Sequence, residues 1–178
     1  MNNKNYWDTY YTKPEKPGHS SFAEFSLMYL DTPIIELGSG TGKDVSFFNH
    51  NNVVARGVDA SFSNDYTTTM DVEEYMNKYE CVGDVYTRFF WHAIDRELQL
   101  KILKWAKFQI FIEARTTEDE NRKKVFSNHS RNYVSVPQIV QDLKDEGYQI
   151  IFLREGTDIS PYKNEDPHLV RIIASREI

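Results

Sequence analysis

The sequence contains a single cysteine, Cys81, among its 178 residues. One cysteine excludes an internal disulfide and is typical of a protein that folds in a reducing compartment. No apolar run approaches the roughly 18 residues that a membrane-spanning helix needs. The polar start, MNNKNYWDTYYTK, lacks the apolar stretch of a secretory signal. These absences predict a cytoplasmic protein that does not insert into a membrane.

An excess of positive charge is also missing. Lys and Arg total 21 against 27 Asp and Glu, which gives a formal net charge of −6. Such a chain has no overall basic field to attract nucleic-acid phosphates or an anionic membrane surface. No Cys, His and carboxylate residues stand at metal-ligand spacing in the sequence. We therefore expect neither a nucleic-acid partner nor a bound metal.

The length suits one domain, residues 1–178, whose 40% hydrophobic content supplies a core. The polar residues 1–19 are expected to form an arm or lid. After them, Ser20 and Ser21 with Glu24 form a capping box that opens a helix with Phe22, Phe25 and Met28 on one face.

Apolar patterns then predict strands that alternate with helices. The strands are expected at 33–37, 53–59, 67–70, 84–90, 108–113, 148–153 and 168–174. Further helices are expected at 43–50, 72–79, 98–106 and 136–146, and residues 116–131 are expected to form a loop. A loop joins the last two strands, which predicts that they are antiparallel. The whole is a doubly wound, Rossmann-like α/β sheet with helices on both faces.

The segment ELGSGTG, residues 36–42, lies between a strand and a helix, where glycines bring backbone N–H groups close to a ligand. A phosphate-binding P-loop does not fit, because Leu37 and Asp44 occupy positions that need a glycine and a hydroxyl residue. The dinucleotide fingerprint needs its third glycine where Lys43 stands. The pattern that remains is an acidic residue followed by Gly38, Gly40 and Gly42.

Glu36, at the end of its strand, suits a ligand that carries positive charge. Asp59 ends the second strand, where its carboxylate can accept hydrogen bonds from both ribose hydroxyls, and Ala60 lies beside it. Asp71, with the backbone of Val72, is placed to accept from an adenine amino group. Asp59 and Asp71 also suit helix caps. An adenosine with a cationic tail describes S-adenosylmethionine.

Residues 36–42 resemble the first motif of class I S-adenosylmethionine-dependent methyltransferases. The segments YTRFFWHAI (86–94), FIEAR (111–115) and EDPHLVR (165–171) resemble a bacterial subgroup of small methyltransferases associated with surface-polysaccharide synthesis. The resemblance implies a seven-stranded mixed sheet in the order 3-2-1-4-5-7-6, ending in an antiparallel hairpin. It also implies S-adenosylmethionine as the cofactor. The loop that begins at Thr116 is shorter than this subgroup leads one to expect.

Arg88 and His92 are the candidate catalytic residues, since they lie at or just beyond the end of the fourth strand, where cofactor and acceptor should meet. Arg88 suits the carboxylate of the cofactor or an anionic acceptor, and alternatively an ion pair with Glu113. His92 suits a general base for a hydroxyl acceptor, and alternatively a packing role above the next helix.

Aromatic residues near the start include Tyr11, which is expected either to cover the cofactor or to fasten the N-terminus to the core. His129, Arg131 and Tyr133 are expected to contact the acceptor or to lie in solvent.

The sequence predicts methyl transfer to an oxygen of a sugar, glycan precursor or other small molecule. Two other functions stay open: a non-catalytic S-adenosylmethionine-binding module of a larger assembly, and a protein or nitrogen methyltransferase. The short chain has little sequence with which to build an acceptor pocket. A homodimer or a partner domain is therefore one way to complete the site.

Overall fold

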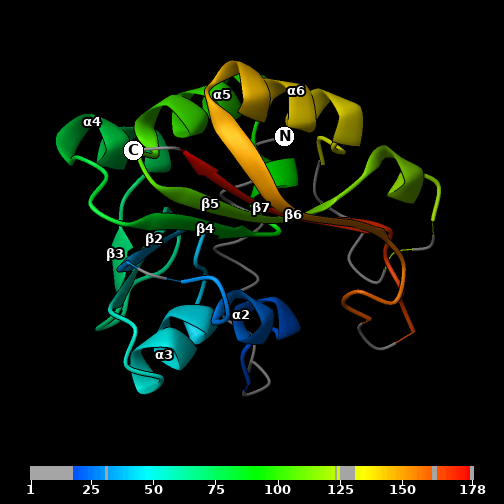
Figure 1. Ribbon diagram of the computed structural model, residues 1–178. Coiled ribbons are helices and arrows are strands. Elements are labelled where there is room, and N and C mark those ends of the chain that lie inside the picture. Colours follow the sequence, from blue (N-terminus) through cyan, green and yellow to red (C-terminus); the bar gives the residue numbers. More distant parts are fainter. Residues whose placement is uncertain (1–17, 31, 123, 125–130, 162–163, 177–178) are drawn as a thin grey trace.

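The computed structural model describes residues 18–30, 32–122, 124, 131–161 and 164–176. They build one seven-stranded sheet in the order β3-β2-β1-β4-β5-β7-β6 (Figure 1). Its strands are β1 (Ile34–Leu37), β2 (Ala55–Asp59), β3 (Thr67–Thr69), β4 (Asp84–Arg88), β5 (Gln109–Arg115), β6 (Tyr148–Gly156) and β7 (Leu169–Arg176).

In this sheet β1 to β5 are parallel, β6 runs in the same direction, and β7 is reversed between β5 and β6. β1 lies between β2 and β4, with Ile34 opposite both Ala55 and Asp84. β7 is antiparallel to both β5 and β6, which confirms the expected terminal hairpin and the order of the strands. Because the parallel strands all run the same way, their carboxyl ends meet at one edge of the sheet, where ligands bind in such folds.

Helices cover both faces of the sheet (Figure 1). One face carries α2 (Ser21–Ser26) and α3 (Lys43–His50), and the other carries α4 (Val72–Lys78), α5 (Arg96–Trp105) and α6 (Val136–Asp145). Each face has its own apolar cluster, so the sheet is the middle of three layers. No helix in the described ranges is long and apolar enough to cross a bilayer.

Polar residues cap the first turns of two helices. The Ser20 hydroxyl caps α2 by accepting the N–H of Ala23, and Asp95 caps α5 in the same way through Leu98. α2 is shorter than the sequence indicates, and Met28 lies beyond it with 72% of its surface exposed. Met28 therefore does not share a helix face with Phe22 and Phe25 as expected, because the helix ends at Ser26.

Several other segments also depart from the expected bounds. β4 ends at Arg88 rather than residue 90, because Phe89 has a φ of +56° and turns the chain into a 3₁₀ turn, η1 (Trp91–Ala93). The predicted loop from residue 116 contains a second such turn, η2 (Thr117–Asp119).

Candidate functional site

The glycine turn after β1 adopts a conformation that other residues rarely take. Gly38, Gly40 and Gly42 have φ values of +72°, +52° and +72°. The N–H of Gly38 donates to the carbonyl of Val58 at 2.8 Å, which holds the turn against β2. A Cβ built on Gly38 would lie 2.3 Å from the ring of Phe90. The turn therefore requires glycine for both its backbone and its close packing against the residues after β4.

Glu36, at the base of the turn, is buried with 4% of its surface exposed. One contact to its carboxylate comes from the backbone N–H of Val45 in α3, but Oε2 has no hydrogen-bond partner among the described residues. Burial raises its pKa well above the ordinary value, and the carboxylates of Asp44 and Asp59 raise it further. Glu36 is thus a carboxyl group that a donor or a cation would stabilise.

Asp59 lies at the end of β2, as expected, and binds the glycine turn directly. Its Oδ2 accepts the N–H of Gly40 at 2.9 Å, and its Oδ1 accepts the N–H of Ser61 at 2.8 Å. These bonds fix the carboxylate beside the turn and on the carboxyl edge of the sheet. Ala60 follows it and is half-buried. The predicted contact with ribose hydroxyls stays a prediction.

Asp71 takes the capping role that the sequence left open. Its Oδ1 accepts the N–H of Glu73 at 2.8 Å at the start of α4, and its side chain is exposed. Val72 is buried and packs in the core. The predicted adenine contact of these two residues stays a prediction.

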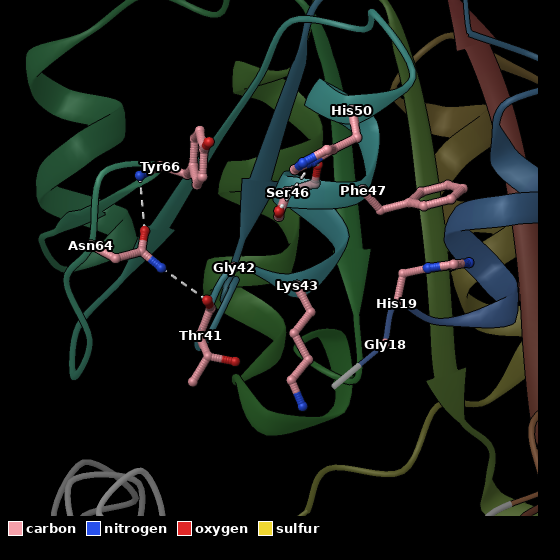
Figure 2. Close-up of a pocket in the computed structure, with 10 residues that line it drawn as sticks. All are labelled: Gly18, His19, Thr41, Gly42, Lys43, Ser46, Phe47, His50, Asn64 and Tyr66. Carbon is pink, nitrogen blue, oxygen red and sulfur yellow. Dashed lines mark hydrogen bonds between the residues drawn. The ribbon is translucent and has the colours of Figure 1, made fainter. Parts of the chain in front are cut away.

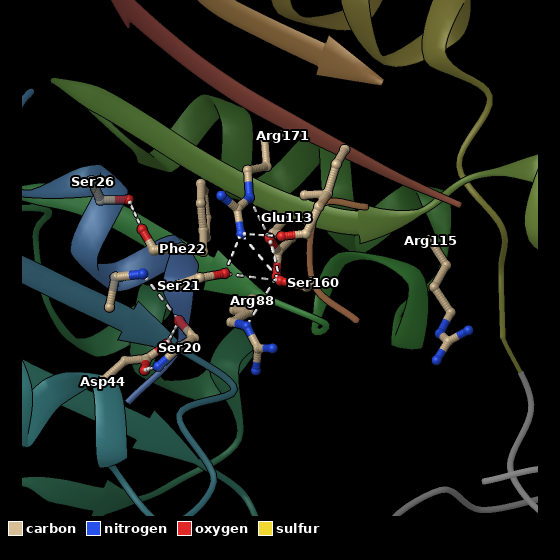
Figure 3. Close-up of polar contacts among 12 residues, drawn as sticks. Ser20, Ser21, Phe22, Ser26, Asp44, Arg88, Glu113, Arg115, Ser160 and Arg171 are labelled. Carbon is tan, nitrogen blue, oxygen red and sulfur yellow. Dashed lines mark hydrogen bonds and ion pairs between the residues drawn. The ribbon is translucent and has the colours of Figure 1, made fainter. Parts of the chain in front are cut away.

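Arg88 forms the ion pair with Glu113 that was the alternative to a ligand contact (Figure 3). Its Nε donates to Oε1 of Glu113 at 2.9 Å. The Glu113 side chain has no exposed surface, whereas that of Arg88 is 29% exposed. Arg171 from β7 donates to the other oxygen of Glu113, and the Ser160 hydroxyl donates to both oxygens. Arg88 is therefore anchored at one end and accessible at the other.

His92 is 3% exposed and held from two sides. Its Nδ1 accepts the backbone N–H of Arg115 at 3.1 Å, and its carbonyl accepts the N–H of Asn132 at 2.7 Å. An imidazole that accepts through Nδ1 carries its proton on Nε2 when neutral. This arrangement supports the packing alternative, in which His92 joins η1 to the end of β5. The general-base role stays a prediction.

Two polar clusters beside the site were not found by sequence reasoning. In the first, Asp44 of α3 accepts hydrogen bonds from the hydroxyls of Ser20 and Tyr86 at 2.6 and 2.9 Å. In the second, Arg115 at the end of β5 pairs with Asp119 and Glu165. The segments FIEAR and EDPHLVR, which contain Arg115 and Glu165, were the signal for the second cluster, although nothing in the sequence paired them.

Other candidates lie at the margin or outside the described residues. Tyr11 lies in range 1–17 and His129 in range 125–130, and both ranges are outside the residues that the structure describes. Arg131 is half-buried, and its pKa is lowered by burial and by the charge of Arg115. The ring of Tyr133 has the ammonium of Lys124 5.2 Å from its centre. None of these contacts assigns an acceptor role.

A pocket beside the glycine turn contains Gly42 but none of the other predicted ligand residues. A shallow pocket of about 470 Å³ lies on the outer side of the turn and α3 (Figure 2). Its lining comprises Gly18, His19, Thr41, Gly42, Lys43, Ser46, Phe47, His50, Asn64 and Tyr66. Thr41 and Gly42 of the glycine turn belong to this lining, whereas Glu36, Asp59 and Arg88 do not.

No protein-family model and no curated protein sequence matches this chain. Several solved structures do match this chain. A SAM-dependent methyltransferase from Anabaena variabilis has a TM-score of 0.68 and 13% identity, covering 98% of this chain and 93% of that one. Magnesium protoporphyrin IX methyltransferase from Synechocystis, solved with bound SAH, has a TM-score of 0.66 and 12% identity, with 97% and 93% covered.

A third match is a SAM-dependent methyltransferase from Archaeoglobus fulgidus, with a TM-score of 0.65, 15% identity, and 86% and 90% covered. The strand order and the reversed final strand agree with the methyltransferase fold that the sequence resemblance implied. The chain therefore has the fold of the S-adenosylmethionine-dependent methyltransferases.

The residues at the sheet edge fit that cofactor chemically. Glu36 supplies a buried carboxyl oxygen without a hydrogen bond, which suits a cationic group, and Asp59 supplies a carboxylate at the adjacent strand end. Gly38 has no room for a side chain, because the ring of Phe90 packs against it. Among the described residues, no His, Cys, Asp and Glu side chains gather as metal ligands.

Proposed function

We propose that the protein is a methyltransferase that uses S-adenosylmethionine. The observation that carries the proposal is the buried, unpartnered oxygen of Glu36 beneath a turn of three glycines with positive φ. A buried carboxyl group without a partner is costly unless a ligand completes it. The sulfonium and ammonium groups of this cofactor supply the matching charge. The methyltransferases of the same fold support this assignment.

In this proposal the glycine turn, Gly38 to Gly42, and Glu36 hold the amino-acid part of the cofactor. Asp59, with Ala60, holds the ribose, and the backbone around Asp71 and Val72 holds the adenine. Tyr11 is proposed as a further cofactor contact. Bound S-adenosylmethionine supplies an electrophilic methyl group, so the chain mainly has to orient the acceptor and exclude water.

The acceptor is proposed to be an oxygen of a sugar, a glycan precursor or another small molecule. Its support is the resemblance of residues 86–94, 111–115 and 165–171 to methyltransferases of surface-polysaccharide synthesis. We also propose that a homodimer or a partner domain covers the carboxyl edge of the sheet and so completes the acceptor site. The enzyme is proposed to act in the cytoplasm.

Calorimetric titration with S-adenosylmethionine and with S-adenosylhomocysteine tests the proposal. We expect micromolar affinity, on the order of −8 kcal/mol, and a loss of about 10-fold or more in Asp59→Ala. Asp65→Ala is the matched control, because Asp65 is an exposed aspartate in the segment between β2 and β3, outside the proposed site. Failure of the wild-type protein to bind either compound would contradict the proposal.

A further inference from the structure

The guanidinium of Arg88 has two terminal nitrogens that its ion pair does not use. The pair with Glu113 forms through Nε, and no hydrogen bond joins the terminal nitrogens to the other described residues. Figure 3 shows these nitrogens on the side of the guanidinium that faces away from Glu113. Two parallel N–H groups of this kind match the oxygens of a carboxylate or a phosphate.

Arg88 shares its ion-pair partner with a second arginine. Glu113 is the one carboxylate in ion-pair contact with Arg88 within the described ranges, and Arg171 pairs with it as well. The side chain of Arg171 is only 9% exposed and that of Arg88 is 29% exposed, so Arg88 is the arginine of this cluster that a ligand can reach. Burial alone would lower the pKa of Arg88, but Glu113 and Asp44 raise it above its ordinary value. The carboxylate of Asp44 is already bonded to two hydroxyl groups.

The neighbouring residue fixes the plane of this guanidinium. Phe89 has a φ of +56°, which is strained for a bulky side chain, and its N–H donates to the carbonyl of Glu113 at 2.9 Å. Its ring lies 4.2 Å from Cζ of Arg88. Strain of this kind persists where the surroundings enforce it, and it is concentrated at ligand sites.

The same turn places Arg88 next to the proposed cofactor site. Phe90, two residues along, packs its ring against Gly38 of the glycine turn. Arg88 and the turn therefore belong to one rigid edge, formed by the ends of β1 and β4, which are paired in the sheet. An oxyanion on Arg88 would belong to a molecule held beside the methyl donor.

We propose that the terminal nitrogens of Arg88, held by Glu113 and stacked on Phe89, bind a carboxylate or phosphate group of the methyl acceptor. The acceptor is then an anionic molecule, and the group that Arg88 binds orients the nucleophilic oxygen. This inference rests on the proposed methyltransferase function. The carboxylate of the cofactor has the same chemistry, so the test must separate the two.

The first arm of the test measures the affinity of S-adenosylhomocysteine by calorimetry in the wild-type protein, Arg88→Gln and Arg88→Lys. Arg154→Gln is the matched control, since Arg154 is an exposed arginine of β6. Wild type and Arg88→Gln are also titrated with decarboxylated S-adenosylmethionine. Thermal unfolding checks that each variant is folded. Lysine keeps a charge beside Glu113 but lacks the two parallel donors.

The second arm titrates each S-adenosylhomocysteine complex with sodium phosphate and sodium malonate, followed by ¹⁵N–¹H spectra at constant ionic strength. We expect all variants to bind S-adenosylhomocysteine within about 3-fold of wild type. We expect saturable anion binding in wild type and Arg154→Gln, and binding about 10-fold weaker or lost in Arg88→Gln and Arg88→Lys.

Other outcomes overturn the inference in distinguishable ways. If Arg88→Gln weakens S-adenosylhomocysteine about 10-fold but not the decarboxylated compound, Arg88 binds the cofactor, and only the acceptor site is wrong. If the wild-type complex binds neither anion, or Arg88→Gln binds them equally well, the acceptor site is also wrong while the methyltransferase proposal stands. If wild type does not bind S-adenosylhomocysteine, the proposed function itself fails, and the acceptor site with it.

Discussion

His92 is held by backbone contacts that do not need an ionisable ring. His92→Ala leaves the buried N–H of Arg115 without its acceptor, so we expect a loss of about 1–3 kcal/mol in the free energy of unfolding. His92→Asn keeps an oxygen that can accept this bond, and we expect it to lose less than half as much. Urea unfolding measures both. Equal losses in the two variants would contradict a role for the Nδ1 contact.

The same pair of variants separates positioning from general-base catalysis once an acceptor is identified. A base requires the imidazole, so both variants would then lose about 100-fold or more in turnover. A positioning role requires only the acceptor atom. On the geometry of the Arg115 contact, we expect His92→Asn to stay within about 3-fold of the wild-type rate, after correction for the fraction folded.

The raised pKa of Glu36 makes stability and ligand affinity depend on pH. Because burial raises this pKa in the folded protein, the folded state holds the proton more tightly than the unfolded chain. Stability is therefore lost as the pH rises from about 4.5 towards the raised value. We expect Glu36→Gln to remove this loss, so that its free energy of unfolding falls less than that of wild type as the pH rises from about 4.5 through the raised pKa of Glu36.

Cofactor affinity should show the opposite slope. A cation beside Glu36 favours the ionised carboxylate, so wild-type affinity for S-adenosylmethionine should rise with pH over the same window. Glutamine cannot ionise, and its affinity should be lower and flatter with pH. Calorimetry across the window checks this, and a parallel pH dependence in the two proteins would show that another group titrates.

At the scale of elements, alanine variants of two glycines measure how much the contact between the glycine turn and the end of β4 contributes to stability. Gly38 and Gly147 have similar positive φ values, +72° and +80°, but only Gly38 has a side chain, Phe90, in the way of a Cβ. We expect Gly147→Ala to cost about 1 kcal/mol from backbone strain alone. Gly38→Ala should cost about 1–3 kcal/mol more and should abolish cofactor binding.

Chemical denaturation and calorimetry on the two alanine variants make this comparison direct. Equal losses would mean that Phe90 moves away without cost and does not fix the turn. The comparison also tests why β4 stops early, since Phe89 and Phe90 leave the strand in order to pack here. Period and propensity predict a longer strand over 84–90, and the positive φ of Phe89 depends on contacts that no local pattern contains.

At the scale of the whole molecule, ligand binding should stabilise the fold as one unit. The proposed site joins β1, β2 and β4, the centre of the sheet. S-adenosylhomocysteine at 100 times its dissociation constant should therefore raise the free energy of unfolding by about 2.7 kcal/mol. Asp59→Ala, with an affinity weaker by about 10-fold or more, should show at most about 1.4 kcal/mol of gain at the same concentration, and Asp65→Ala should show all of it. An undiminished gain in Asp59→Ala would move the ligand to another site.

The sequence by itself determined most of the elements, and it predicted the class of ligand. Alternating apolar runs specify strands and helices through neighbouring residues, and ELGSGTG after a buried strand specifies a turn that only glycines can adopt. These are local properties, so they can be derived without the fold. The reversed last strand also followed from the short connection before it. Met28 shows the limit of such local prediction, because one helical turn more or less decides whether its side chain is buried.

Only the tertiary structure decided what the polar residues of the site do. Arg88 meets Glu113, 25 residues away, and His92 meets Arg115, 23 residues away. Asp44 bonds to Tyr86 across 42 residues. Such contacts depend on which strands lie side by side and on the conformation at Phe89, neither of which is encoded in spacing along the chain. The sequence named Arg88 and His92, and the packing of β4 against β5 left one accessible and buried the other.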